Sequence, residues 1–242
     1  MARMDRGDVR IEAGTAALEG RLSMPEGANG LVVFAHGSGS GRHSPRNRFV
    51  ADHLNERGLG TLLFDLLTAD EESIDAQTGE YRFDIGFLSS RLTATVDWVS
   101  RRESSRPRTA RTRIGIFGAS TGAAAALITA ADRPALVRAV VSRGGRPDLA
   151  SAALARVIAP TLFIVGANDE SVVDLNQRAA ARMRTVHELS IVSGASHLFQ
   201  EPGKLETVAE LATAWFATYL RPEQPPETAD YRDAASRHDR NL

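Results

Sequence analysis

One serine stands in a sequence context that could make it a nucleophile. Ser120 lies at the centre of GASTG, residues 118–122, which fits the pattern G-x-S-x-G. In this pattern the serine takes a strained backbone conformation where a strand turns sharply into a helix. The residues two before and two after it must lack bulk for the turn to close. We therefore predict a nucleophile elbow that lifts the Ser120 hydroxyl clear of a sheet.

The five-residue pattern also has simpler explanations. A glycine- and serine-rich turn can join strand to helix in any α/β domain. GASTG further resembles the cofactor turn of short-chain dehydrogenases, a family that also needs a Tyr-x-x-x-Lys pair. Lys204 is the only lysine of the chain, and Gln200 stands four residues before it. Because that pair is absent, the elbow is the better interpretation.

A serine hydroxyl becomes a good nucleophile only when a base removes its proton, so the elbow requires a histidine and a carboxylate. In this arrangement the chain order is serine, acid, histidine. Of the histidines after Ser120, His187 opens a strand and His238 lies in a polar tail. His197 lies in SGASHLF, a Gly/Ser loop from which a side chain can reach back over a sheet edge. We predict that His197 is the base.

The acid should follow the strand that comes after the elbow unit. Asp169, in VGANDESV directly after an apolar run, has this position. Its task would be to fix the tautomer of His197 and to stabilise the imidazolium. Glu170 and Asp174 are the alternatives, and Glu170 also suits an acid at a helix N-terminus.

When a serine attacks a carbonyl carbon, the carbonyl oxygen becomes a negatively charged oxyanion, which needs two N–H donors. The Thr121 N–H at the start of a helix is one, and the loop AHGSGSG, residues 35–41, supplies Ser38 as the second. A glycine-rich loop can instead cradle a dinucleotide, with Asp65 as the acid that binds the ribose. However, the spacing is G-x-G-x-G, and the next helix begins only near Pro45. We therefore expect an oxyanion loop and no dinucleotide site.

Each of these candidates follows a strand of an expected α/β domain. Continuous apolar runs indicate buried parallel strands, and apolar steps of three and four residues indicate amphipathic helices. Residues 9–25 read as two antiparallel edge strands, and the polar residues 68–82 as a surface loop that covers the site. Strands are expected at 31–35, 61–67, 114–117, 139–142, 161–165 and 187–192, and helices at 45–57, 85–99, 122–132, 149–157, 172–184 and 205–219.

The composition limits the possible functions. The chain has 242 residues, 43% of them hydrophobic, and a formal net charge of -1, which gives no sign of a nucleic-acid partner. No apolar run approaches a membrane span, and no apolar segment follows the charged N-terminus, so we expect a cytoplasmic protein that is not bound to a membrane. The absence of cysteine excludes disulfides and thiolate metal sites, and we expect neither a metal nor a cofactor. We expect a single domain over 1–220 and a polar tail over 221–242, and a homodimer is compatible with this organisation.

The motifs HGSGSG, GASTG, GAND and SH, in this order, resemble those of the α/β-hydrolase superfamily. The chain resembles its dienelactone-hydrolase-like branch over roughly residues 17–220. This resemblance implies a mostly parallel central sheet with helices on both faces and no large cap domain. Dienelactone hydrolases use a cysteine nucleophile, whereas this chain has Ser120. The difference favours an ordinary serine esterase over lactone chemistry.

We therefore expect a hydrolase that cleaves a small ester through an acyl-serine intermediate. A non-catalytic binding or regulatory protein on the same fold, or an acyltransferase, remains the alternative. Arg42, His43, Arg46 and Arg48 cluster beside the oxyanion loop, which suggests an anionic acyl group. A solvated helix face would explain the same cluster.

Overall fold

A computed structural model describes residues 4–28, 30–102 and 112–221 of the protein. The tail expected at 221–242 lies outside the described residues, apart from Arg221. The strands are β1 Met4–Ala13, β2 Ala16–Pro25, β3 Gly30–Ala35, β4 Gly60–Phe64, β5 Arg113–Ala119, β6 Val137–Arg143, β7 Thr161–Gly166 and β8 His187–Val192. The helices are α1 Pro45–Glu56, α2 Ala69–Thr78, α3 Ile85–Arg102, α4 Thr121–Asp132, α5 Glu170–Ala180 and α6 Lys204–Tyr219.

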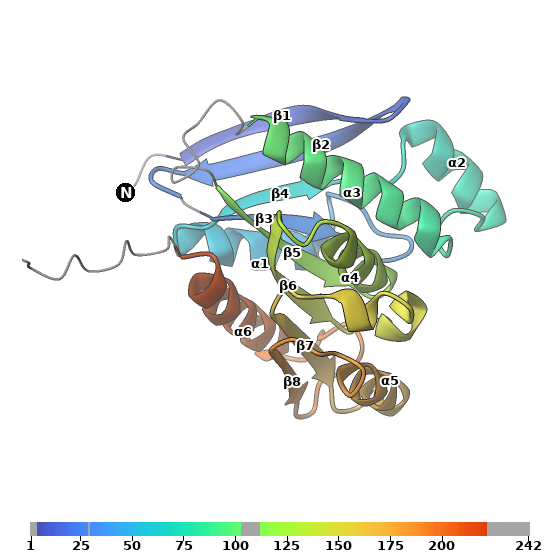
Figure 1. The fold of residues 1–242 in the computed structure, drawn as a ribbon, viewed down its shortest axis with the longest axis vertical. Coiled ribbons are helices and arrows are strands. Elements are labelled where there is room, and N and C mark those ends of the chain that lie inside the picture. The colour runs from blue at the N-terminus through green and yellow to red at the C-terminus, as the bar shows by residue number, and fades with distance from the viewer. Residues whose placement is uncertain (1–3, 29, 103–111, 222–242) are drawn as a thin grey trace, which may run out of the picture.

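The eight strands form one sheet in the order β1-β2-β4-β3-β5-β6-β7-β8 (Figure 1). β1 and β2 are an antiparallel pair at one edge, and β2 also runs antiparallel to β4. From β4 to β8 every neighbouring pair is parallel. The carboxyl ends of these strands therefore meet along one edge of the sheet, where α/β folds bind their ligands. This is the α/β architecture that the sequence predicts.

Helices cover both faces of the sheet. In β3, Val33 and Ala35 pack into the core beneath α3 and α4, whereas Val32 and Phe34 pack into the core beneath α1 and α6. The alternation follows from the two-residue period of a strand, and burial on both faces explains why the run is apolar throughout. No large cap domain is present in the described part of the chain, and no described helix could cross a membrane.

The structure differs from the expected elements in several places. The segment 68–82 was expected as a loop, but it contains α2, so that prediction is wrong. β4 ends at Phe64, three residues before the expected end, and α5 starts and ends earlier than the expected helix at 172–184. The expected helix at 149–157 is instead two short 3-10 turns, Pro147–Ala150 and Leu154–Arg156.

Candidate active site

Ser120 occupies a strained turn between β5 and α4. Its φ is 51°, a left-handed value that it shares, among described residues other than glycine, only with Phe199. A Cβ on Gly118 would lie 2.5 Å from the Ala123 Cα, and one on Gly122 would lie 2.5 Å from the His36 carbonyl oxygen. The two glycines of the motif are therefore required by the close approach of neighbouring backbone.

Backbone hydrogen bonds hold this turn in place. The Ser120 N–H donates to the Arg143 carbonyl at 3.2 Å, which ties the turn to the end of β6. The Ser120 carbonyl accepts from the Ala123 and Arg146 N–H groups, each at 3.1 Å. A strained conformation persists only where the surrounding structure holds it, and these hydrogen bonds hold Ser120 at its unfavourable φ.

Asp169 and His197 come together at the same edge of the sheet. Asp169 follows β7 and His197 lies in the loop after β8, and their Oδ2 and Nδ1 atoms are 2.6 Å apart. The Asp169 side chain makes no capping hydrogen bond to α5, although it stands at the N-cap position. With Nδ1 donating to Asp169, the Nε2 atom is left to accept a proton. The alternatives are engaged differently: Asp174 pairs with Arg178 at 2.6 Å on the surface, and Glu170 opens α5.

Ser120 and His197 line one cavity of about 210 Å³. In the described structure no hydrogen bond joins their side chains. Such catalytic contacts are often long without substrate and tighten when it binds. The other lining residues are Gly37, Ser38, Ser40, Arg46, Ala119, Arg143 and Leu198.

The expected oxyanion loop lies against the elbow. A Cβ on Gly37 would lie 3.0 Å from the Ser120 Cβ, and the Ser38 and Thr121 hydroxyls are 3.1 Å apart. Thr121 is the first residue of α4, so its N–H has no acceptor within the helix. The structure thus brings Ser38 and Thr121 side by side next to Ser120, at the positive end of α4.

A buried histidine fixes the start of this loop. The ring of His36 has its Nδ1 atom 3.0 Å from the Gly37 carbonyl oxygen, and its Nε2 accepts from the Leu66 N–H at 3.0 Å. One nitrogen must donate and the other accept, so the imidazole is neutral. Burial lowers the pKa of His36 below its usual range, in agreement with these contacts.

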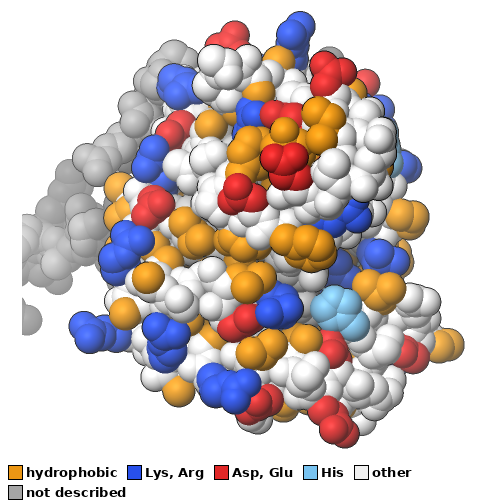
Figure 2. Space-filling view, turned by 90° about the vertical axis from the view of Figure 1, so that its right-hand side faces the viewer, with side chains coloured by type: hydrophobic (Ala, Val, Ile, Leu, Met, Phe, Trp, Pro, Cys, Tyr) orange, Lys and Arg blue, Asp and Glu red, His pale blue; other side chains and the backbone are white. Residues whose placement is uncertain are grey.

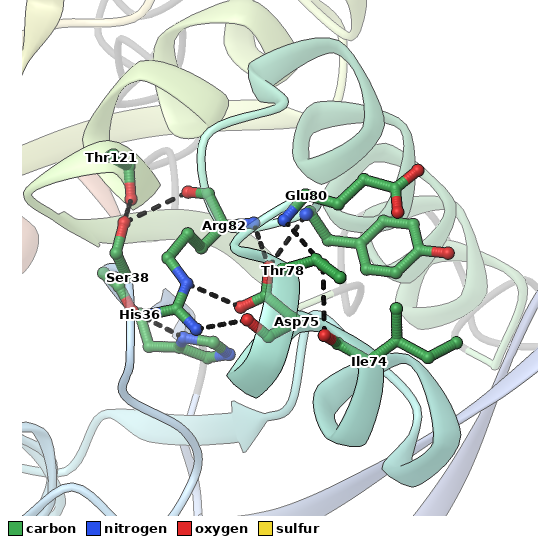
Figure 3. A network of polar contacts seen from close by, with 10 residues as sticks. His36, Ser38, Ile74, Asp75, Thr78, Glu80, Arg82 and Thr121 are labelled. Carbon is green, nitrogen blue, oxygen red and sulfur yellow. Dashed lines mark hydrogen bonds and ion pairs between the residues drawn. The ribbon is translucent and has the colours of Figure 1, made fainter.

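The other side of the loop is held through Arg82 (Figure 3). The Ser38 hydroxyl donates to the Arg82 carbonyl at 3.0 Å. Asp75 in α2 accepts from the Tyr81 and Arg82 N–H groups at 2.8 and 2.9 Å, and from the Arg82 Nε at 2.8 Å. Burial acts to raise the pKa of Asp75, but these hydrogen bonds outweigh it and hold the pKa below its usual value. Sequence reasoning missed this connection because α2 was not expected.

A second cavity, of about 130 Å³, lies on the α2 side of the same loop. It shares Gly37, Ser38 and Ser40 with the first and adds apolar side chains, among them Leu66, Leu67 and Leu88. Figure 2 looks onto the side of the molecule that carries α2, where hydrophobic side chains continue to the surface. Exposed Ile74 and Phe83 belong to this part of the chain.

The basic cluster predicted near the loop divides between two hollows, because Arg42, His43 and Arg48 line one and Arg46 lines the Ser120 cavity. Arg42 forms an ion pair with Asp65, and the Asp65 Oδ1 also accepts from the Arg42 N–H at 2.6 Å. Arg48 lies 3.3 Å from the His43 ring and outside the cavity. Only Arg46 of the cluster lines the Ser120 cavity, so Arg42 is not the contact for an anionic substrate that the sequence suggested. Sequence reasoning missed Arg143, which lines the cavity from the end of β6.

In the part of the chain that the structure describes, no three His, Asp or Glu side chains are grouped as metal ligands would be.

The sheet order and the strained serine define the α/β-hydrolase class of fold, and similarity to known proteins makes the assignment narrower. The sequence model of the dienelactone hydrolase family matches residues 18–220, and the chain belongs to this family. The crystal structure of a dienelactone hydrolase from Anabaena variabilis is 52% identical with a TM-score of 0.85, and the match covers 90% of this chain and 99% of that one.

Two further similarities support narrower conclusions. Est1E from Butyrivibrio proteoclasticus has a TM-score of 0.72 over 88% of this chain and 99% of its own, and at 16% identity it supports the fold alone. A Mycobacterium tuberculosis protein named "Putative phosphoribosyl transferase" is 53% identical over 213 residues, 88% of this chain. The match spans only 46% of that relative, so its name describes a protein about twice as long.

Proposed function

We propose that this protein is a serine hydrolase that cleaves a small carboxylic ester through an acyl-Ser120 intermediate. The observation that carries the proposal is the hydrogen bond of 2.6 Å between His197 and Asp169 at the cavity that also contains Ser120 on its strained turn. Membership of the dienelactone hydrolase family supports hydrolysis in general. The cavity of about 210 Å³ is smaller than most drug-sized ligand sites, which favours a small substrate.

The proposed reaction has two halves. His197 Nε2 takes the Ser120 proton while Oγ attacks the ester carbonyl carbon, and the carbonyl oxygen becomes an oxyanion that the Ser38 and Thr121 N–H groups stabilise. The imidazolium then gives its proton to the leaving alkoxide, which leaves an acyl-serine. Water enters, and His197 takes its proton while the water oxygen attacks the acyl carbon. The bond from that carbon to Ser120 Oγ then breaks, the acid leaves, and the imidazolium returns its proton to Oγ. Asp169 holds the imidazole orientation throughout.

The test is hydrolysis of p-nitrophenyl acetate by the wild type and by Ser120→Ala, with Ser40→Ala as the matched control for a hydroxyl lining the same cavity. We expect Ser120→Ala to lower kcat at least about 10³-fold, and Ser40→Ala to retain most of the activity. A fluorophosphonate probe should label the wild type and leave Ser120→Ala unlabelled. Equal labelling of both, or equal turnover, would instead favour a binding protein that keeps the fold without the chemistry.

The alternative reaction is acyl transfer to an acceptor other than water. It is distinguished from hydrolysis by adding alcohols to the assay and measuring both products, because a transferase forms the new ester faster than the free acid. The phosphoribosyl transferase name belongs to relatives of which this chain spans 46%, and the proposal does not carry it over to this site.

A further inference from the structure

Two guanidinium groups without partners line the Ser120 cavity. Arg143, the last residue of β6, is 7% exposed, and its Nε and Nη1 atoms are buried without a hydrogen-bond partner. Arg46, in the first turn of α1, has a buried Nε atom that also lacks a partner. Buried cations are normally paired, so a buried unpaired arginine with a second unpaired arginine in the same cavity requires an explanation.

The surrounding charges do not compensate these two arginines. Burial, together with the positive charge of Arg46, lowers the pKa of Arg143 to about 10, so the Arg143 side chain remains charged at neutral pH. Neither makes an ion pair with any described residue. Other arginines of the same loops are neutralised: Arg42 pairs with Asp65, and Arg146 pairs with Asp148 at 2.8 Å.

The backbone fixes Arg143 beside the nucleophile. Its carbonyl accepts the Ser120 N–H at 3.2 Å, and it is the register partner of Ala119 in the sheet. A group bound by this guanidinium would therefore lie within the substrate cavity. The energetic cost of two cations in one cavity, one of them buried, would be offset by a ligand that supplies two negative charges and accepts several N–H bonds.

From this geometry we propose that Arg46 and Arg143 form a subsite for a dianionic phosphate group carried by the ester substrate. A phosphate dianion matches the two positive charges, and its oxygens accept the forked N–H groups of both guanidiniums. A carboxylate would neutralise only one of the two. The inference rests on the proposed function in one respect, namely that the molecule bearing the phosphate is the ester cleaved at Ser120.

Binding of inorganic phosphate tests the subsite without any catalysis. Calorimetric titration of Ser120→Ala at low ionic strength gives a reference Kd for phosphate and for acetate. Adding Arg46→Gln or Arg143→Gln should weaken phosphate binding by roughly 10- to 100-fold each, because each removes charge-assisted hydrogen bonds. Arg48→Gln, on the same helix but outside the cavity, is the matched control and should change the Kd less than about twofold.

Protein stability separates a ligand site from a structural role. Because Arg143 is buried and unpaired, Arg143→Met should raise the Tm, whereas a structural arginine would lower it. If Arg143→Gln does not fold, Arg143→Lys keeps the charge without the fork, and the partly exposed Arg46 can still be changed to Gln. A lowered Tm for Arg143→Met together with unchanged phosphate binding in Arg46→Gln would overturn the proposal.

Turnover then links the subsite to the substrate. An aryl ester with a phosphate on its acyl chain is compared with its neutral analogue, and the ratio of the two kcat/KM values should fall at least tenfold in Arg46→Gln and stay unchanged in Arg48→Gln. Acetate binding as tight as phosphate, or phosphate binding indifferent to both arginines, would contradict the subsite even if neutral esters are cleaved. Arginine-dependent phosphate binding without any ester cleavage would contradict the proposed function instead.

Discussion

The strain at Ser120 depends on glycines that leave no room for a side chain. We expect Gly122→Ala to destabilise the fold by roughly 2 kcal/mol or more, because the new methyl group would overlap the His36 carbonyl oxygen, 2.5 Å from its carbon. Urea unfolding measures the change. Gly7→Ala is the control, since a Cβ there meets nothing within 4 Å. An equal effect of both substitutions would mean that the elbow is not tightly packed.

His36 makes stability depend on pH. Its pKa is lowered by burial in the folded protein, whereas in the unfolded chain it titrates near about 6.5. The unfolded chain therefore binds the additional proton first, and stability is full above about pH 6.5 and falls as the pH drops toward the lowered folded pKa. We expect the urea midpoint to fall from pH 7.5 to 5.5, and to fall less in His36→Gln. The other histidines contribute to the pH dependence of the wild type and of His36→Gln alike. The effect of His36 is therefore the difference between the two proteins in how steeply the urea midpoint changes with pH.

At the scale of single residues, the sequence predicted those site residues whose positions depend on the order of strands along the chain. Ser120, Asp169 and His197 each follow a predicted strand, and parallel strands place their carboxyl ends together, so their meeting could be expected. Their roles remain a prediction. Arg143 could not be found in this way, because it ends an apolar strand, and its surroundings become a cavity only where β5, α1, the loop at 37–40 and the loop of His197 meet.

Among the elements, α2 shows where periodicity fails as a guide. Only Asp75 is buried in this helix, so the segment has no apolar stripe to indicate a helix. Its ends carry the information instead: Thr68 and Glu71 form a capping box, and Gly79 ends the helix with a φ of 69°. The pattern T-x-x-E followed by a glycine was present in the sequence and would have predicted the helix.

The link from α2 to the oxyanion loop gives a prediction for Asp75. Asp75→Asn removes the charge that orients Arg82, whose carbonyl holds the Ser38 hydroxyl. We expect kcat for p-nitrophenyl acetate to fall about 3- to 30-fold with little change in KM, which is less than the loss of an oxyanion donor itself. Asp70→Asn, at the exposed start of α2, is the control. A rise in KM alone would indicate that α2 contacts substrate and does not position the loop.

For the whole molecule, the sequence predicted the sheet and its helical layers because buried strands and amphipathic helices alternate along the chain. The edge pair β1–β2 and the absence of a large cap domain were also confirmed. The cytoplasmic location and the homodimer stay predictions, since a single chain carries no information on either.

The two tryptophans test whether the domain expected over residues 1–220 unfolds as one unit. Trp98 in α3 packs against the core on one face of the sheet, and Trp215 in α6 packs against the core on the other. Both cores include side chains of the same strands, so loss of one layer should expose the other. We therefore expect Trp98→Phe and Trp215→Phe, each reporting through its remaining tryptophan, to give urea transitions that coincide with the far-UV circular dichroism of the same variant. Separate fluorescence and dichroism midpoints would show that the layers unfold independently and that the sheet does not couple them.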